Sequence, residues 1–440
     1  MATRRLVLGR GPDALRVAAV LAAKGFAVTL LQMGPGPSGL LHPDLPVDTG
    51  LVRIAADQRA IAERALGSLV EAPEAGRAVW IGGAAHALPL TPAAARRLLP
   101  PRVGLVAARS LVRSRVRNRV AQLIGGGQEE RTYADWVIRR MGGPAWHHLY
   151  AHYAVARFGE DPRRLAASAA RHVHGVPSPL APVLAGCPAE APYAQAVALI
   201  ESAGGEIRSN QRPTRIVVEG GKISAVELAD GSSIPTGGPL WCTLPAAVLL
   251  PLLGDAVLPT SQSDAAFLQV RDHVQVALRG DPKALPAELH VLDDRASFWR
   301  VTRPSGHDQA AIFHLTLPAD SAPGDDALPA RIAEEARAIG LGEFSAVGAR
   351  VERLVGWTPV WRVTAHTRLR LLQLLFRPLG LIAVGRGGTF SPLDPGEEIG
   401  WAAALCEDAD PDQRELFRQR IEPVGKVDDL DVSPLSLIVR

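Results

Sequence analysis

The residues best suited to chemistry lie in a short glycine-containing turn near the beginning of the chain. The turn is Gly9-Arg10-Gly11-Pro12-Asp13-Ala14, and it follows the apolar run Leu6-Val7-Leu8. Glycines at these spacings let the chain turn tightly and let backbone amides approach a pyrophosphate, which then sits on the positive end of the following helix. The turn therefore predicts a dinucleotide-binding site that uses Gly9, Gly11 and Ala14.

Three residues at or near this turn differ from a typical dinucleotide site. Ala14 replaces the third glycine, and Asp13 places a carboxylate at the mouth of the helix where a phosphate should lie. Gln32 ends the next strand, where an acidic residue usually holds the ribose hydroxyls. The pattern predicts the fold more strongly than it predicts a bound cofactor. A nucleotide-type fold that no longer binds a nucleotide tightly remains an alternative.

The helix and strands that must position this turn are predicted in the segments directly before and after it. An alanine-rich helix is expected after the turn, and Gly25-Phe26-Ala27-Val28-Thr29-Leu30-Leu31 begins the next strand. Strand, glycine turn, helix and strand in this order form a βαβ unit. Later segments alternate between helical spacing, from about residue 58 to 175, and strand patterns at 193–250 and 267–317.

Composition limits the class of protein. The chain has 440 residues, which is more than one core usually fills, so two associated domains are expected. Its net charge of +3 is small for this length and excludes a general nucleic-acid binder. Three scattered cysteines make a disulfide framework or a zinc site improbable. Nearly all the positive charge is arginine, which with abundant alanine, glycine and proline suggests a GC-rich bacterial genome.

The expected location is the cytoplasm. The chain enters a strand directly, without the apolar core of a signal peptide. No apolar run reaches the ~20 residues that a membrane-spanning helix needs.

After Gln32 the sequence resembles a known group of flavoproteins. A loop with Ser38-Gly39 leads to Leu45-Pro46-Val47-Asp48-Thr49-Gly50. This order resembles the flavin-dependent amine oxidase and protoporphyrinogen oxidase superfamily, which includes phytoene desaturases and UDP-galactopyranose mutases. In that group a glycine pair, an arginine and a D-x-G turn follow the second strand. Asp48 and Gly50 match the turn, whereas Leu40 and Leu41 stand where the arginine is expected.

Three further segments keep the order of the same superfamily. They are Tyr133–Pro162, similar to a passage of the helical substrate domain; Trp357-Thr358-Pro359-Val360-Trp361, similar to an aromatic turn at the active site; and Leu381–Phe390 with Asp394–Gly400, similar to the closing flavin segment. One departure has chemical consequences. Pro213 occupies the position of a valine whose backbone groups hold the adenine, and proline has no N–H to donate.

The resemblance implies an α/β protein with a Rossmann-type FAD-binding domain of the GR2-like kind, interleaved with an α+β substrate domain. It assigns residues 1–57, 190–255 and 345–406 to the FAD/NAD(P)-binding domain, 58–189 and 256–344 to the substrate domain, and 407–440 to a C-terminal tail. The implied cofactor residues are Gly9, Gly11, Ala14, Gln32, Asp48, Gly50, Gly385, Arg386 and Asp394. Arg300 and Trp361, with Pro359, are expected at the substrate cavity.

Two functions follow from this resemblance. The first is an FAD-dependent oxidoreductase that moves a hydride from a small organic substrate to the flavin, since the cofactor carries the chemistry in such proteins. The second is a pseudoenzyme that keeps the fold as a binding or assembly module. Support for the second comes from five cofactor-facing departures, at Arg10, Asp13, Gln32, Pro213 and Leu40. A redox-neutral, mutase-like role is a third possibility.

Two other features suggest partners. Nine arginines and three acids lie between Pro101 and Arg140. A solvated or domain-facing helix is the simplest interpretation, and a surface for acidic lipid headgroups, an anionic substrate or a protein partner stays open. His148 and His152 are four residues apart and could point together, but no third ligand accompanies them, so no metal site is predicted.

Overall fold

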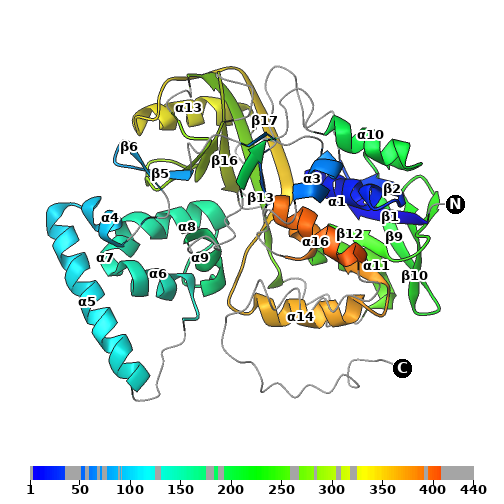
Figure 1. Ribbon diagram of the computed structural model, residues 1–440, viewed down its shortest axis with the longest axis horizontal. Helices are drawn as coiled ribbons and strands as arrows, with labels where there is room; N and C mark the ends of the chain where they lie inside the picture. The colour runs from blue at the N-terminus through cyan, green and yellow to red at the C-terminus, as the bar shows by residue number, and fades with distance from the viewer. Residues whose placement is uncertain are drawn as a thin grey trace.

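The computed structural model of the chain describes residues 3–34, 51–54, 59–66, 70–71, 77–87, 90, 92–123, 130–174, 183–186, 193–257, 267–281, 285–303, 309–317, 325–390 and 395–407. Figure 1 shows three regions side by side. A helical unit lies on the left, a large and mainly antiparallel sheet at the top, and a parallel sheet with its helices on the right.

A five-stranded sheet carries the amino-terminal turn. Its strands are parallel throughout, in the order β18-β12-β1-β2-β8. Their bounds are Leu381–Ala383 (β18), Leu240–Cys242 (β12), Arg4–Gly9 (β1), Ala27–Gln32 (β2) and Glu206–Arg208 (β8). β1 lies at the centre, and β1 and β2 read as almost continuous apolar runs because helices cover the sheet.

Helix α1 (Gly11–Ala23) is buried along its whole length. It packs against α3 (Arg59–Leu66), α10 (Ala194–Ser202) and α16 (Pro395–Glu407). Five of its thirteen residues are alanines, which allow these close approaches, while Leu15 and Leu21 supply the larger apolar contacts. The sequence prediction of a βαβ unit is confirmed.

A seven-stranded sheet forms the second region, in the order β17-β13-β16-β15-β14-β5-β6. The strands are Phe344–Pro359 (β17), Val270–Gly280 (β13), Ala310–Leu317 (β16), Arg300–Thr302 (β15), Glu288–Val291 (β14), Arg77–Ile81 (β5) and Ala84–Ala87 (β6). Helix α13 (Leu328–Ala338), preceded by the turn η5 (Asp325–Ala327), covers one face and buries Ile332 beside Phe313. β17 forms one edge of this sheet.

The remaining strands of the described residues form two smaller sheets. One has the order β11-β10-β9, with strands Ser233–Pro235, Lys222–Leu228 and Pro213–Glu219. The other has the order β3-β7-β4, with strands Leu51–Ile54, Val183–Gly186 and Val70–Glu71. Helices α11 (Ala246–Leu253) and α14 (Ala365–Phe376) lie on the parallel-sheet side of the molecule (Figure 1). The turn η3 (Gly254–Ala256) follows α11 in the chain, and the short α15 (Gly385–Gly388) follows β18.

The helical unit contains α4 (Pro92–Arg97), α5 (Pro101–Leu123), α6 (Tyr133–Met141), α7 (Gly143–Ala145), the π-helical turn η2 (Trp146–Tyr150), α8 (Ala151–Phe158) and α9 (Ala167–His174). A capping box starts α6, because Thr132 accepts from the amide of Asp135 at 3.1 Å and Asp135 accepts from the amide of Thr132 at 3.0 Å. The unit docks on the large sheet through α8, where Thr316 Oγ1 donates to the carbonyl of Arg157 at 2.7 Å.

Candidate functional site

The glycine turn is closely packed against the neighbouring strand. A Cβ added to Gly9 would lie 2.1 Å from Thr243 Oγ1 and 2.6 Å from the Cβ of Ala14. The amide of Thr243 also donates to the carbonyl of Leu8 at 3.0 Å. Gly9 and Ala14 therefore allow helix α1 to sit tightly on β1 and the segment after β12.

The Arg386 loop lies directly beside this turn. A Cβ added to Gly385 would lie 3.2 Å from Thr243 and 3.4 Å from the Cβ of Asp13. One added to Gly387 would lie 2.5 Å from the carbonyl oxygen of Thr243. Segments more than 370 residues apart thus converge at the carboxyl end of the parallel sheet, where open α/β sheets place their ligands.

A buried ion cluster fills the mouth of helix α1. Arg16 donates to Glu398 Oε2 from Nε at 3.1 Å and from NH2 at 2.8 Å, and it also binds Asp13. Asp13 and Arg16 are 3% exposed and Glu398 is 1% exposed. Tyr193 accepts from Arg16 NH1 at 3.3 Å. The chain therefore places its own carboxylates at the first turns of α1 and α16, where helix dipoles favour negative charge.

The protonation of Glu398 reflects this crowding. Burial raises the pKa of its carboxyl to about 8, and the neighbouring Asp13 carboxyl adds to the rise. The guanidinium groups of Arg16 and Arg386 oppose it, the latter with Nε 3.8 Å from Glu398 Oε1. Glu398 consequently holds its proton near neutral pH.

An indole ring lies against the glycine of the turn. Gly11 has a φ of +64°, and a Cβ added there would lie 3.0 Å from Cζ3 of Trp357. The guanidinium carbon of Arg386 is 5.2 Å from the centroid of the Trp357 ring. The Trp357 ring therefore fills the space where a side chain at Gly11 would lie, within the turn that approaches a pyrophosphate in dinucleotide sites.

Asp272 fixes the strand end that carries this indole. Its Oδ1 accepts from the amide of Gly356 at 3.0 Å, and its Oδ2 lies 3.5 Å from NH1 of Arg353. Burial lowers the pKa of Arg10, and the Asp272 carboxylate opposes that shift. Asp272 on β13 therefore holds the part of β17 just before Trp357, and its charge acts on the Arg10 side chain of the turn.

The end of β2 is closed by main-chain hydrogen bonds. The amide of Gln211 donates to the carbonyl of Gln32 at 2.9 Å, and the amide of Asn210 donates to the carbonyl of Gly34 at 2.7 Å. Gln32 itself is only 1% exposed. Pro213 begins β9 opposite Leu228. The amides of the loop after β8 thus form hydrogen bonds within the protein. The resemblance implies that nearby backbone groups would instead bind a nucleotide.

Some predicted cofactor residues cannot be placed. Asp48, Gly50 and Asp394 lie outside the described residues, as do Ser38, Gly39, Leu40 and Leu41. Among the described ones, Gly9, Gly11, Ala14, Gly385 and Arg386 surround the same turn, and Gln32 ends the adjoining strand.

The two residues predicted for catalysis lie in different surroundings. Trp361 is 5% exposed, and its Nε1 donates to the carbonyl of Phe390 at 2.7 Å. It follows Pro359, which ends β17 opposite Val270. Arg300 begins β15 and enters a buried polar network that the sequence patterns did not reveal.

Two histidines form one half of this network. Nδ1 of His314 lies 3.2 Å from NH2 of Arg300 and 3.1 Å from Nε2 of His273, and Nε2 of His314 lies 2.7 Å from Thr302 Oγ1. Because Arg300 can only donate, His314 accepts at Nδ1 and donates from Nε2 to Thr302. Burial lowers the pKa of both histidines well below the ordinary value, and the Arg300 guanidinium lowers it further.

The other half joins the sheet to the helical unit. Glu288 Oε1 lies 3.1 Å from Nε2 of His290 and 3.5 Å from NH1 of Arg300. Nδ1 of His290 lies 2.7 Å from the hydroxyl of Tyr153, which accepts from NH1 of Arg157 at 3.0 Å. The hydrogen-bond roles are consistent along this path if Tyr153 donates to His290 and His290 donates to Glu288. The network is filled by mutually paired side chains of the protein.

The two histidines that are four residues apart lie in η2 and α8. His152 Nε2 lies 3.2 Å from the carbonyl of Ala296, and His148 is exposed. Within the described ranges, no group of three or more histidine, cysteine, aspartate or glutamate residues is arranged to hold a metal ion.

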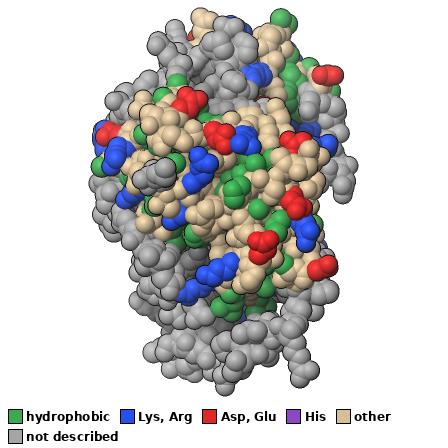
Figure 2. Space-filling model, turned by 90° about the vertical axis from the view of Figure 1, so that its right-hand side faces the viewer, with side chains coloured by type: hydrophobic (Ala, Val, Ile, Leu, Met, Phe, Trp, Pro, Cys, Tyr) green, Lys and Arg blue, Asp and Glu red, His purple; other side chains and the backbone are tan. Residues whose placement is uncertain are grey.

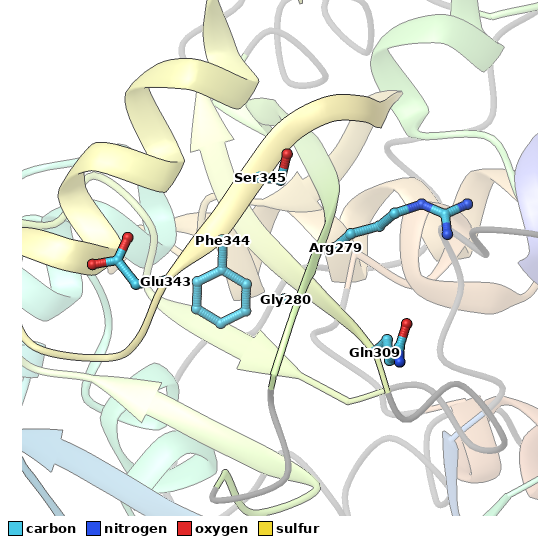
Figure 3. A pocket seen from close by; sticks show the side chains of 6 residues that line it. All are labelled: Arg279, Gly280, Gln309, Glu343, Phe344 and Ser345. Carbon is cyan, nitrogen blue, oxygen red and sulfur yellow. The ribbon is translucent and has the colours of Figure 1, made fainter.

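A surface hollow lies elsewhere on the molecule. It measures about 560 Å³ and is lined by Arg279, Gly280, Gln309, Glu343, Phe344 and Ser345 (Figure 3). These residues come from the edge of the seven-stranded sheet, where Phe344 packs edge-on against Phe313 with centroids 5.1 Å apart. None of the residues predicted for the site lines this hollow.

Solved structures share this fold. No protein-family model and no curated protein matches the sequence. The chain aligns with reduced UDP-galactopyranose mutase over 97% of its own length and 98% of that chain, with a TM-score of 0.73 and 13% identity. A protoporphyrinogen oxidase-like protein from Exiguobacterium sp. 255-15 gives 0.64 at 15% identity over 92% and 98% of the two chains. An oxidoreductase from Methanosarcina mazei gives 0.61 at 12% identity over 92% and 100%.

These neighbours fit the superfamily that the motifs resemble, and the predicted fold class is confirmed. The chain has the mixed α/β fold with a Rossmann-type parallel sheet that these oxidoreductase and mutase structures share. At such low identity the likeness establishes the fold alone.

The described residues do not fit the diphosphate of FAD at this turn. Trp357 occupies the approach to Gly11, and buried carboxyl groups of Asp13 and Glu398 occupy the helix mouths. A diphosphate there would have to displace the Trp357 ring and the side chains of this buried cluster.

Proposed function

We propose that this chain keeps the fold of the flavin-dependent oxidoreductases but works as a binding or assembly protein without flavin redox chemistry. One observation carries the proposal, namely the Trp357 ring against Gly11 at the place of pyrophosphate approach. Position 11 is still a glycine, but the space left by its missing side chain is filled by packing within the protein.

Electrostatics supports the same proposal. Helix N-termini attract phosphate because their amides and dipoles are positive. Here the side chains of Asp13 and Glu398, both bonded to Arg16, lie buried in the first turns of α1 and α16. The Arg300–His314 and Glu288–His290 contacts support it further, since the polar groups of the neighbouring sheet are paired with one another.

A second candidate is an FAD-dependent oxidoreductase acting on a small molecule. The observation that favours it is the convergence of Gly9, Gly385 and Arg386 at one end of the parallel sheet. Binding FAD in this place would require Trp357 to leave Gly11.

The decisive measurement is the visible absorption spectrum of the purified full-length protein, before and after incubation with excess FAD and removal of free cofactor. Flavin retained by the protein absorbs in the blue and near-ultraviolet. We expect a colourless protein that keeps no flavin. A yellow protein with one flavin per chain would overturn the proposal and leave the oxidoreductase.

A pair of variants tests the cause. Gln32→Glu with Pro213→Val restores the residues typical of relatives but leaves the indole in place, so no flavin should bind. Adding Trp357→Ala frees the approach to Gly11 and should raise FAD affinity at least about tenfold, since each charge-assisted hydrogen bond to the backbone contributes roughly 1.5–3 kcal/mol. Circular dichroism confirms that both variants are folded. Equal flavin binding by both would show that Trp357 is not the obstruction.

A further inference from the structure

Exposed apolar side chains are concentrated on helix α5. Ten large apolar side chains are exposed among the described residues, and five of them belong to this helix. They are Leu105, Val106, Val112, Val116 and Val120, with exposed fractions between 51% and 62%. Single exposed apolar residues are ordinary, whereas five on one helix call for a partner.

Four of these side chains share one face. Leu105, Val112, Val116 and Val120 are spaced by seven, four and four residues, which places them in one stripe along an α-helix. The opposite face is used for packing, because Ala107 is buried and its carbonyl lies 3.3 Å from a Cβ added to Gly142. The stripe therefore points away from the protein.

The same helix is strongly basic. Residues 92–128 contain eight arginines and no aspartate, glutamate or lysine. Arg102, Arg109 and Arg113 are exposed, and within the described part of the chain no ion pair is recorded for them. By contrast, basic and acidic side chains are intermixed on the face shown in Figure 2. The charge of α5 is thus local, in a chain whose net charge is only +3.

We propose that the outer face of α5 docks on an anionic lipid bilayer. The valine and leucine stripe enters the boundary between headgroups and acyl chains. Arg109, which lies within the stripe, and Arg113 beside it extend their guanidinium groups to lipid phosphates. Long arginine side chains suit this position because their stems lie on apolar surface while their heads stay among phosphates. Among the described helices none is long and apolar enough to cross a membrane, so the contact is with the surface.

Other occupants suit this face less well. A second copy of the helix would bring arginines against arginines, and like charges at close range repel. Nucleic acid would satisfy the arginines but leave the apolar stripe without apolar contacts.

A second basic and apolar stretch supports the proposal. Phe267, Val363 and Leu374 are three of the five remaining exposed apolar side chains, and they lie on or near α14. The guanidinium carbon of Arg368 is 3.7 Å from the centroid of the Phe267 ring. Residues 353–393 contain no acidic residue. In Figure 1, α14 and the C-terminal end of α5 lie toward the same lower margin.

The test is flotation of the full-length protein with vesicles of phosphatidylcholine alone or mixed with phosphatidylglycerol, at low and at high salt. We expect association with the mixed vesicles only, weakened by salt. Removing two arginines with Arg109→Gln and Arg113→Gln should weaken association about 30-fold, because each basic residue near an anionic surface contributes about 1 kcal/mol. Val112→Ser, Val116→Ser and Val120→Ser together should weaken it at least about tenfold.

Matched controls separate this contact from general charge or hydrophobicity. Arg4→Gln with Arg337→Gln removes the same charge elsewhere, and Val347→Ser changes a valine that is 84% exposed on β17; both should float as the wild type does. Arg109→Lys with Arg113→Lys keeps the charge and should keep association.

The proposal fails if the wild type does not bind mixed vesicles, binds neutral vesicles equally well, or binds mixed vesicles regardless of the α5 changes. It also fails if the valine changes remove self-association, measured by light scattering, but leave the binding to vesicles unchanged. Flavin takes no part in these measurements, so they stand apart from the proposed function.

Discussion

Gly11 shows how a motif residue can be kept while its task changes. In a dinucleotide site the second glycine lets a pyrophosphate approach the backbone. Here the neighbour of Gly11 is the Trp357 ring, 3.0 Å from where a Cβ would stand. The residue type alone cannot distinguish these tasks, because both require a small residue with positive φ.

This contact predicts the outcome of Gly11→Ala. The change introduces backbone strain, because Gly11 has a φ of +64°, and overlap with Trp357. We expect a loss of about 2–4 kcal/mol in the free energy of unfolding, of which about 1 is strain and the rest overpacking. Urea unfolding followed by circular dichroism measures it.

Gly220 provides the matched control. Its φ is +58°, and nothing lies within 4 Å of an added Cβ, so Gly220→Ala introduces strain alone. In a Trp357→Ala background the two glycine changes should become equal to within about 0.5 kcal/mol. If Gly11→Ala stays the more damaging of the two in that background, the indole is not what presses on Gly11.

At the scale of elements, the paired strands β14, β15 and β16 hold their polar side chains inside the protein. Glu288, Arg300 and His314 come from three neighbouring strands and are linked by contacts of 3.2 Å and 3.5 Å. Breaking one partner of a buried charge pair is destabilising because the other remains desolvated.

We therefore expect Glu288→Gln to lower the free energy of unfolding by about 2–3 kcal/mol. The comparison is Glu206→Gln, whose ion pair with Arg208 at 2.8 Å is exposed and should contribute less than about 0.5 kcal/mol. A double-mutant cycle with Arg300→Met should show coupling above about 1 kcal/mol. Equal, small effects at Glu288 and Glu206 would mean that the network does not support the fold.

The helices and strands were largely predictable from the sequence, whereas the contacts between side chains of different elements were not. Leu6-Val7-Leu8, the glycines and the alanine-rich helix predicted the βαβ unit correctly, because its parts are neighbours in the chain and their pattern is local. The predicted strand patterns around Val274 and Phe313 also hold. Their histidines were overlooked, since alternation marks a strand but does not show that His273 and His314 face each other.

The candidate site was predictable only in part for the same reason. Asp13 at the helix mouth was a visible signal in the sequence. Its consequence depends on Glu398, 382 residues beyond Arg16 in the chain, and nothing in either segment marks the other. The resemblance placed Trp361 of the Trp357–Trp361 turn at the substrate cavity, and only the folded chain shows Trp357 against Gly11.

At the scale of the whole molecule, a buried carboxyl group and two buried imidazoles respond to pH in opposite directions and so make opposite contributions to stability. Burial raises the pKa of Glu398 to about 8 from 4.5, so the folded state retains a proton that the unfolded state loses. Its contribution is complete below pH 4.5 and is lost as the pH rises towards 8. Burial lowers the pKa of His273 and His314 well below 6.5, so their contribution is present above pH 6.5 and is lost on acidification.

These signs predict a stability maximum near the ordinary histidine pKa of 6.5 and a decline on both sides. Between pH 6.5 and 8 Glu398 dominates, and linkage gives a fall of about 1–2 kcal/mol in the free energy of unfolding. Glu398→Gln is neutral at every pH and keeps an acceptor for Arg16, so its alkaline decline should disappear while the acid decline from the histidines remains. Urea titrations at a series of pH values measure both arms. A wild-type protein whose stability rises from pH 6.5 to 8 would show that Glu398 is ionised at neutral pH, and with it that the Asp13–Arg16–Glu398 cluster is more open to water than its burial requires.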